Sequence, residues 1–344
     1  MPDDNLKKKT RDRGFFANRL ERAREDLLNY DDYLVFLGTS ASKPQKKRAC
    51  SSIYFKIKDK RFLIDAGENF QRTLLSLEIG FELDFICLTH KHYDHIGGLI
   101  GYLSSQSLYD RKNPLTVYGP KIIETLKKFL EELAINISYP LKWVLVEKDQ
   151  KIEFENFSLK TFEMDHSCYN LAYLIELKPV FRFNRLLSQE LRLEDQEKKL
   201  ISKGLDIIKD GNLIKSTLVN SLVEDSLKIL VTGDTRPINC KNIDSDIVIT
   251  ECTYFRDQKL ADLKKHTSLY NNRDLTDFKK YYNFETIILT HINEEFSTKI
   301  GDKLKEIFKK KNIFFAYDLA TINISHNNKN LKNKIFENIL KNLL

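Results

Sequence analysis

The feature that most constrains this chain is a short run of metal-binding residue types, Thr89-His90-Lys91-His92-Tyr93-Asp94-His95. The whole chain has 7 histidines, and three of them fall in this run, directly after the apolar pair Cys87-Leu88. A sharp loop at the end of a strand can direct His90 and His92 at one ion, and Asp94 and His95 at a second. Neutral imidazole and carboxylate suit zinc. The run therefore predicts a metal-binding loop rather than a solvated histidine cluster.

Three further residues follow predicted strands and are candidate ligands. His166 comes after the segment 162–165, Asp234 after 229–233 and His291 after 287–290. Taken singly, each would more often be a surface or capping residue. Loops at the ends of strands can converge on a common site, so together with the metal loop they predict ligation. Asp234 has two oxygens and could bridge two ions about 3.5–4 Å apart, an arrangement that suits in-line attack on a phosphodiester.

Composition predicts a soluble globular protein in a reducing compartment. Hydrophobic residues make up 42% and charged residues 31% of the chain, and we find no run of about 18 apolar residues that could span a membrane. The N-terminus is charged, unlike a secretory leader, and contains acidic residues, unlike a mitochondrial transit peptide. The cysteines form no CxxC pair, which argues for free thiols rather than a structural zinc site; they are Cys50, Cys87, Cys168, Cys240 and Cys252. We therefore expect a cytoplasmic location.

The hydrophobic pattern divides the chain into three parts. Residues 1–30 form a charged extension whose apolar residues, Phe16, Leu20, Ala23 and Leu27, share one helical face. Residues 31–326 carry short strands, with helices interleaved near 99–107, 121–133, 272–282 and 298–309. Within that part, residues 179–227 have helical spacing and look like an insertion. Residues 327–344 end in an amphipathic helix. Strands first and helices later predict an α/β sandwich whose two sheets pack together beneath flanking helices.

The sequence resembles ribonuclease Z, the tRNA 3′-processing endonuclease of the metallo-β-lactamase superfamily. The resemblance covers roughly residues 33–325. Besides the metal loop, it rests on the segments 36–44, 63–68, 111–120 and 233–235, and on Glu251-Cys252-Thr253, His266-Thr267, Leu289-Thr290-His291 and Asp318.

The resemblance implies a fold, a ligand set and a reaction. The fold would be an αββα sandwich of two mixed sheets with helices on the outer faces. His90, His92 and His166 would hold one zinc, Asp94, His95 and His291 the other, and Asp234 would bridge them. Asp94 would also help to activate the attacking hydroxide, and His266, oriented by Glu251, would protonate or stabilise the leaving 3′ oxygen. Cleavage of precursor tRNA would leave a 3′-OH on the tRNA and a 5′-phosphate on the trailer.

Several alternatives stay open. Residues 179–227 stand where the family has its tRNA-gripping arm, but they contain eight basic and eight acidic residues and no Gly/Pro-rich tip. A phosphodiesterase for cyclic nucleotides or other small diesters is therefore the second hypothesis, and a non-catalytic RNA-binding protein of the same fold is the third. The net charge of +7 is compatible with an RNA partner. Manganese or iron could replace zinc. The family resemblance also allows a homodimer.

Overall fold

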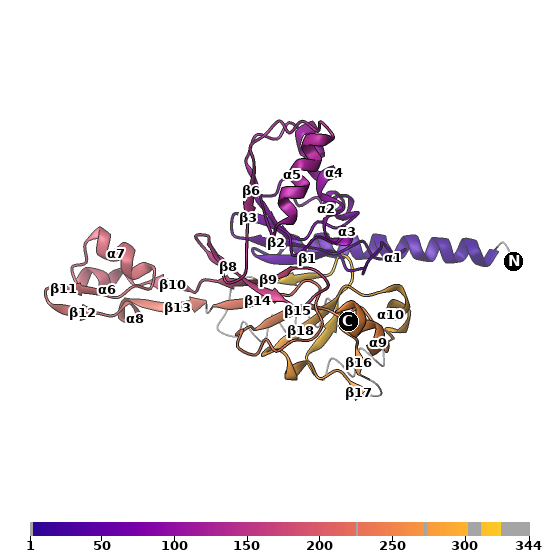
Figure 1. Cartoon of the computed structure of the whole chain (residues 1–344). Helices are drawn as coiled ribbons and strands as arrows, with labels where there is room; N and C mark the ends of the chain where they lie inside the picture. The colour runs from indigo at the N-terminus through magenta and orange to yellow at the C-terminus, as the bar shows by residue number, and fades with distance from the viewer. Residues whose placement is uncertain (1–2, 225, 272–273, 302–310, 325–344) are drawn as a thin grey trace.

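Two mixed sheets packed face to face form the body of the protein in the computed structural model, which describes residues 3–224, 226–271, 274–301 and 311–324 (Figure 1). The first sheet has the order β20-β1-β2-β3-β4-β5-β6. These strands are Thr321–Asn323, Tyr33–Gly38, Ser52–Ile57, Lys60–Ile64, Phe85–Cys87, Leu115–Gly119 and Leu141–Leu145. The second sheet has the order β19-β18-β15-β14-β9-β8-β7. Its strands are Ile313–Phe315, Thr286–Thr290, Ile247–Glu251, Leu227–Val231, Asn170–Leu177, Phe157–Met164 and Lys151–Glu153.

Each sheet has a parallel half whose strand ends determine where a site can form. Strands β3 to β6 run parallel in the first sheet, and β14, β15, β18 and β19 run parallel in the second. The carboxyl ends of parallel strands meet at the same edge of a sheet, where the loops that follow them gather. The predicted ligand loops follow β4, β14 and β18, so the topology brings them to this edge.

The core between the sheets is apolar and rich in aromatic rings. Phe62 is fully buried, and its ring stacks on those of Phe55, Phe85 and Phe157 at centroid distances of 5.0, 4.5 and 5.5 Å. Strand β3 contributes Phe62, β2 and β4 contribute its neighbours in the same sheet, and β8 contributes Phe157 from the facing sheet. Burying each such side chain stabilises the fold by about 1.5–3 kcal/mol. Because Phe157 and Phe62 come from different sheets, their contact helps to hold the two sheets together.

Helices cover the outer face of each sheet. Side chains of α1 (Asp3–Leu28), α2 (Phe70–Leu77), α4 (Leu99–Leu108) and α5 (Ile122–Glu132) share one apolar cluster with the outer face of the first sheet. On the second sheet, Phe296 of α10 (Glu294–Lys299) packs in a separate cluster with residues of β14, β15 and β18. The layers are therefore helix, sheet, sheet, helix, as the sequence predicts.

The long helix α1 packs on the body through its second half. Ala23 and Leu27, two residues of the predicted apolar face, are buried, whereas Phe16 is 46% exposed. The Arg24 guanidinium donates hydrogen bonds to the carbonyl of Ser76 at 2.6 and 3.0 Å. The other half of the helix extends away from the sandwich (Figure 1).

Residues 180–224 form an arm that projects from the body on the side opposite α1 (Figure 1). Its stalk is an antiparallel ribbon of β10 (Val180–Phe183) and β13 (Asn220–Glu224). Its tip combines α6 (Arg185–Glu190), α7 (Asp195–Ser202), the hairpin β11 (Ile207–Lys209) and β12 (Asn212–Ile214), and α8 (Ser216–Val219). The tip has a small core of its own, which includes Leu193, Ile201 and Val219. The helical spacing of this segment is therefore only part of its pattern, because two short strand pairs interleave with the helices.

The region near the C-terminus departs in part from the expected helices. The segment 272–282 is not a helix in its described part, where β17 (Asp274–Leu275) and a 3₁₀ turn, η1 (Phe278–Lys280), stand instead. The side chain of Asp277 caps that turn by accepting a hydrogen bond from the amide of Lys279 at 3.2 Å, which favours a turn over a continuous helix. The segment expected at 298–309 lies mostly outside the described residues. The predicted helix at 327–344 lies outside them entirely.

Candidate metal centre

The metal loop begins where β4 ends and runs into the single-turn helix α3 (Tyr93–Ile96). His90 lies in the loop and is fully buried, and Asp94 and His95 lie in the helical turn, also buried. The amide of Ala66 donates to the carbonyl of His95 at 2.7 Å and that of Gly98 to the carbonyl of Ala66 at 2.8 Å. This turn is therefore fixed against the loop that follows β3.

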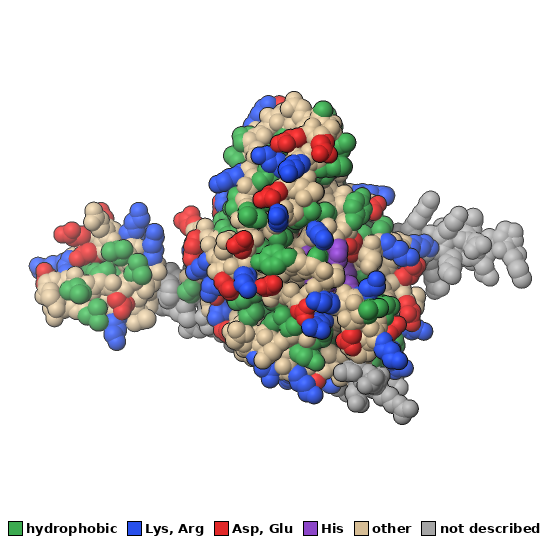
Figure 2. Space-filling model, in the orientation of Figure 1, with side chains coloured by type: hydrophobic (Ala, Val, Ile, Leu, Met, Phe, Trp, Pro, Cys, Tyr) green, Lys and Arg blue, Asp and Glu red, His purple; other side chains and the backbone are tan. Residues whose placement is uncertain are grey.

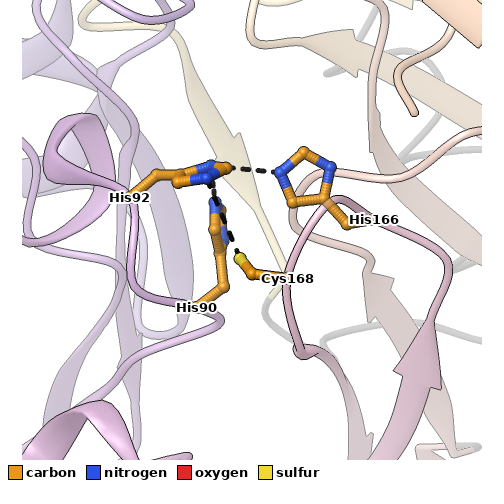
Figure 3. A group of neighbouring side chains, drawn as sticks. All are labelled: His90, His92, His166 and Cys168. Carbon is orange, nitrogen blue, oxygen red and sulfur yellow. Dashed lines mark hydrogen bonds between the residues drawn. The ribbon is translucent and has the colours of Figure 1, made fainter. Parts of the chain in front are cut away.

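Three histidines form the first group of facing nitrogens. His90 Nε2 and His166 Nε2 each lie 3.1 Å from His92 Nδ1, and the three rings converge on one point from two loops (Figure 3). Ligands about 2.1 Å from a tetrahedral zinc lie about 3.4 Å from one another. The spacing of these nitrogens is therefore close to that of one ion's coordination shell.

Asp94, His95 and His291 form the second group. His291 Nε2 lies 3.0 Å, and His95 Nε2 3.8 Å, from Asp94 Oδ2. The backbone amide of Ser42, in the loop after β1, donates to the same carboxylate oxygen at 2.6 Å. Burial opposes ionisation of Asp94, but the hydrogen bond from His291 and the charge of His95 hold the pKa of its carboxyl well below the usual range. Asp94 is therefore a carboxylate at neutral pH.

Asp234 lies between the two groups and offers one oxygen to each. Its Oδ2 lies 3.7 Å from His90 Nε2 and 3.9 Å from His166 Nε2. Its Oδ1 lies 3.3 Å from His95 Nε2 and 3.4 Å from His291 Nε2. Among the described side chains, His95 Nε2 and Asp234 Oδ1 are buried without a hydrogen-bond partner. Buried polar atoms of that kind are costly unless something satisfies them, so this donor set fits divalent metal ions.

Outer partners orient imidazoles of both groups, and those of His95 and His291 show how. His95 Nδ1 lies 2.6 Å from Asp65 Oδ2, and Asp65 also accepts from the amide and hydroxyl of Thr89 at 2.8 Å each. His291 Nδ1 lies 2.9 Å from the hydroxyl of Thr253. Partners of this kind fix the ring orientation and tautomer of metal-binding histidines. In both cases Nδ1 makes the outer contact and Nε2 faces the centre.

The backbone adopts uncommon conformations where these residues lie. His291 has a φ of +53° and Asp65 a φ of +61°, in the left-handed region that non-glycine residues seldom occupy. Gly233, with a φ of +63°, precedes Asp234, and a Cβ there would meet Asn170 Oδ1 at 2.7 Å. Such conformations persist where surrounding structure enforces them, often at functional sites.

His266 and Glu251 form a pair beside the first group. His266 Nδ1 lies 2.8 Å from Glu251 Oε1, and the amides of Thr235 and Thr267 donate to the same oxygen at 3.0 and 3.2 Å. Burial alone would lower the pKa of His266, but the Glu251 carboxylate, with help from Asp234, raises it to about 9. The ring is therefore an imidazolium at neutral pH, and its Nε2 can donate a proton.

The three histidines of the first group are neutral. Burial holds the pKa of His90 well below its usual value, and burial also lowers the pKa of His92 and His166. A neutral imidazole has a lone pair to offer a metal, whereas an imidazolium has none. The protonation states therefore agree with the geometry of the first group.

Asp318 supports the loop that carries Ser42. It accepts hydrogen bonds from the hydroxyl of Thr39 and the amide of Ala49, both at 2.6 Å, so it holds the two ends of the segment between β1 and β2. Burial raises the pKa of the Asp318 carboxyl to about 6, against the opposing effect of those hydrogen bonds and of Arg48. Asp318 itself lies at a distance from the metal groups, and its role is to position this loop.

The structure thus brings together all nine residues that the sequence singles out, and it adds others. The sequence alone assigns no role to Asp65 or Thr253, whose contacts depend on loops far apart in the chain. It also gives no role to Cys168, whose Sγ lies 3.9 Å from His92 Nε2 (Figure 3). With His90, His92 and His166, Cys168 makes one of the groups that could hold a metal ion. Its position two residues after His166 is the signal that could have found it.

Comparisons with known proteins identify the family of the chain. The family model "Anti-Pycsar protein Apyc1" matches residues 33–208. The chain is 28% identical to "Ribonuclease Z" of Methanosarcina mazei over 306 residues, which cover 85% of this chain and 98% of that protein. It is 31% identical to "Ribonuclease Z" of Clostridium novyi over 276 residues, covering 75% of this chain and 88% of that protein.

Solved structures show the same fold. Human tRNase Z, short form, superposes with a TM-score of 0.58 at 18% identity and covers 85% of this chain and 99% of that one. Zinc-bound PqqB from Methylobacterium extorquens gives a TM-score of 0.57 at 12% identity, covering 85% of this chain and 100% of that one. The metallo-β-lactamase fold protein YhfI from Bacillus subtilis gives 0.55 at 17% identity, covering 84% and 98%. The chain therefore belongs to the ribonuclease Z family and has the metallo-β-lactamase fold, and residues 33–208 also match the Anti-Pycsar protein Apyc1 model.

Proposed function

We propose that this protein is a metal-dependent endoribonuclease that cuts precursor tRNA on the 3′ side of the mature end. Two observations support the proposal: the family, whose members named above are called ribonuclease Z, and the position of Asp234, which offers one carboxylate oxygen to each of two ligand groups. The position of Asp234 supports phosphodiester cleavage at a two-ion site, and the family carries the choice of precursor tRNA as substrate.

We infer that two zinc ions are the cofactor. His90, His92 and His166 would hold one ion, Asp94, His95 and His291 the other, and Asp234 both. Nitrogen and oxygen donors of this kind suit zinc, although the same donors admit manganese or iron. Ions bound there would lower the pKa of a water molecule and neutralise charge on the phosphate.

The protein's own side chains would then move the protons. Asp94 is ionised and held by the Ser42 amide, so its carboxylate can accept a hydrogen bond from the attacking water and help to activate it. His266 is protonated and held at Nδ1 by Glu251, so its Nε2 can donate a proton to the departing 3′ oxygen. An alkoxide is a poor leaving group, and a positioned acid typically accelerates such a step by about 10²–10⁴-fold. The products would be a tRNA with a 3′-OH and a trailer with a 5′-phosphate.

We also propose that the protein works in the cytoplasm. All five cysteines, which lie within the described residues, are free thiols, and four of them are buried. Free thiols are typical of a reducing compartment. Separately, none of the described helices has the length and apolar character of a membrane span.

A second candidate function is hydrolysis of cyclic nucleotides or other small phosphodiesters. The charge of the arm favours it, because residues 183–220 contain seven basic and six acidic side chains. Such a tip attracts a polyanion only weakly. The metal centre itself would serve either substrate.

Relative kcat/KM values separate the two functions. Purified metal-loaded protein would be assayed on precursor tRNA, on a cyclic nucleotide and on a small chromogenic diester. The proposed function predicts that precursor tRNA is by far the best substrate. A cyclic nucleotide cleaved more efficiently than precursor tRNA would replace the first function with the second.

A further inference from the structure

A pocket of about 530 Å³ opens beside the first ligand group, and no step of the proposed reaction uses it. Its lining includes His166, Tyr169, Met164 and Lys265. Its size lies within the range of small-molecule sites. Lys265 precedes His266, whose ring centroid lies 4.9 Å from that of His166. The pocket therefore adjoins the side of the centre from which a proton would reach the departing oxygen.

One wall of the pocket is a fixed aromatic ring. Tyr169 is 42% exposed, yet its hydroxyl accepts a hydrogen bond from the backbone amide of Lys148 at 3.0 Å. That bond holds the tip of the side chain against a neighbouring loop. Binding of a ligand would therefore cost little additional conformational entropy of the ring. Any nucleic acid base, whatever the sequence around it, can stack on an exposed aromatic ring. Tyr169 is therefore suited to receive a base.

Both acidic residues of the lining, Glu163 and Asp165, are paired with cations. Asp165 forms ion pairs with two cations, Lys265 at 2.8 Å and Arg236, so one carboxylate faces two positive groups. The other acidic residue of the lining, Glu163, is paired with Lys148 at 3.1 Å. Lys265 is also fixed through its backbone, because its carbonyl oxygen lies 3.1 Å from His166 Nδ1. Figure 2 shows Lys and Arg side chains among the acidic and hydrophobic side chains near the histidines on this face. With Arg236 and Lys148, which adjoin the lining, three cations face two carboxylates, so one positive charge is left to attract a phosphate.

We propose that this pocket binds the nucleoside whose 3′ oxygen departs, with its base stacked on Tyr169 and its 5′-phosphate near Lys265 and Arg236. The assignment rests on the proposed function, because it takes His266 as the donor to that oxygen. It adds a specific subsite for the last nucleotide of the product RNA. Adenosine 5′-monophosphate has the same 5′-phosphate and free 3′-OH as that nucleotide and is a suitable probe.

Cys168 provides a direct readout of pocket occupancy. It lines the pocket and is half-buried, whereas the other four cysteines are buried. Iodoacetamide, which reacts with accessible thiolates, should therefore label Cys168 first in the metal-loaded protein. We expect adenosine 5′-monophosphate to slow this labelling more than ribose 5-phosphate or inorganic phosphate at the same concentration. Equal protection by all three would overturn base recognition in the pocket.

Substitution of the ring tests the same point. Tyr169→Leu should abolish the difference between adenosine 5′-monophosphate and ribose 5-phosphate. Tyr169→Phe keeps the ring and should restore that difference. Tyr109→Leu is a matched control, since Tyr109 is 66% exposed and lines a different pocket, between α2 and α4. In that variant adenosine 5′-monophosphate should protect Cys168 as it does in the unaltered protein.

The kinetic consequence is a rise in KM. Losing one base–aromatic stack should raise the KM of Tyr169→Leu for precursor tRNA by about 5- to 150-fold. The rise in KM of the same variant for a small chromogenic diester, which has no base to stack, should be much smaller. Equal KM values for the Leu and Phe variants would overturn the proposal.

The two proposals fail in different ways. If the unaltered protein does not cut precursor tRNA but adenosine 5′-monophosphate selectively protects Cys168, the endonuclease proposal fails and the pocket remains a nucleotide site. If it cuts precursor tRNA while the ring variants match the Tyr109→Leu control in labelling and KM, the pocket proposal fails and the endonuclease proposal stands.

Discussion

Asp65→Asn provides a sharp test of how the metal centre is organised. Asp65 is buried, and its Oδ2 lies 2.6 Å from His95 Nδ1. Asparagine has nearly the same shape, and its oxygen can still accept from the Thr89 amide. Its NH₂ group would then face His95 Nδ1–H, so the hydrogen bond that orients this ring is lost. The predicted effect is weaker binding of the metal ion held by His95, with little change in the fold.

The size of the effect follows from that one bond. A hydrogen bond to a charged group contributes about 1.5–3 kcal/mol, and about 1.4 kcal/mol corresponds to a tenfold change in affinity. Asp65→Asn should therefore weaken the second metal site by about 10- to 150-fold, which overlaps the roughly 10- to 100-fold losses typical of outer partners of metal ligands. The loss should be larger at the second ion, because Asp65 contacts His95 directly. It reaches His90 of the first group only through the hydroxyl of Thr89, which lies 2.9 Å from His90 Nδ1.

Chelator competition with metal content measured by mass spectrometry would give both affinities. Asp84→Asn is a matched control, since Asp84 also accepts a backbone hydrogen bond, from Arg61 at 2.8 Å, but lies away from the centre. Two unchanged affinities in Asp65→Asn would refute the idea that Asp65 sets the orientation of His95. Equal weakening of both sites would refute the assignment of His95 to the second ion.

Three further predictions concern single substitutions. His92→Ala should abolish RNA cleavage while the melting temperature of the metal-free protein shifts by less than about 4 °C, because His92 lies on a loop; substantial remaining cleavage would contradict its role as a ligand. His266→Ala should lower kcat by about 10²–10⁴-fold with little change in KM, and an unchanged kcat would return His266 to a structural role. Asp318 has a pKa raised to about 6 in the fold against 3.8 ordinarily, so its neutral form stabilises the fold fully below about pH 4 and that contribution is lost as pH rises through 6. The unfolding free energy of the unaltered protein relative to Asp318→Asn should thus fall by about 2 kcal/mol between pH 4 and 7, and a difference that rises with pH would show that the sign is wrong.

The sequence predicts the strands and metal ligands because both leave strong local signals. The runs around Phe62 and Phe85 are short, apolar or alternating between apolar and polar residues, and bounded by turn residues, as strands are. Three histidines crowded within 90–95 are typical of a metal loop. The segment 179–227 is harder, since its helices, hairpin and ribbon are too short for periodicity to separate. The apparent helix at 272–282 is overridden by a local side-chain cap at Asp277.

The outer contacts of the centre could not be read from the sequence. The bonds from Asp65 to His95 and from Thr253 to His291 join residues 30 and 38 positions apart, and the Ser42 amide reaches Asp94 across 52 positions. Such contacts depend on how loops from different strands meet, which residue type alone does not fix. The pocket beside His166 is of the same kind, because its aromatic and basic walls come from separate loops.

The most direct test of metal-dependent tRNA cleavage is to map the cut in a precursor tRNA labelled at its 5′ end. We expect a single product ending at the 3′ side of the mature tRNA with a free 3′-OH, formed by the metal-loaded protein, absent after chelation and restored by added zinc. Cleavage that persists in excess chelator, or an intact precursor with two zinc ions bound per chain, would contradict the proposed mechanism.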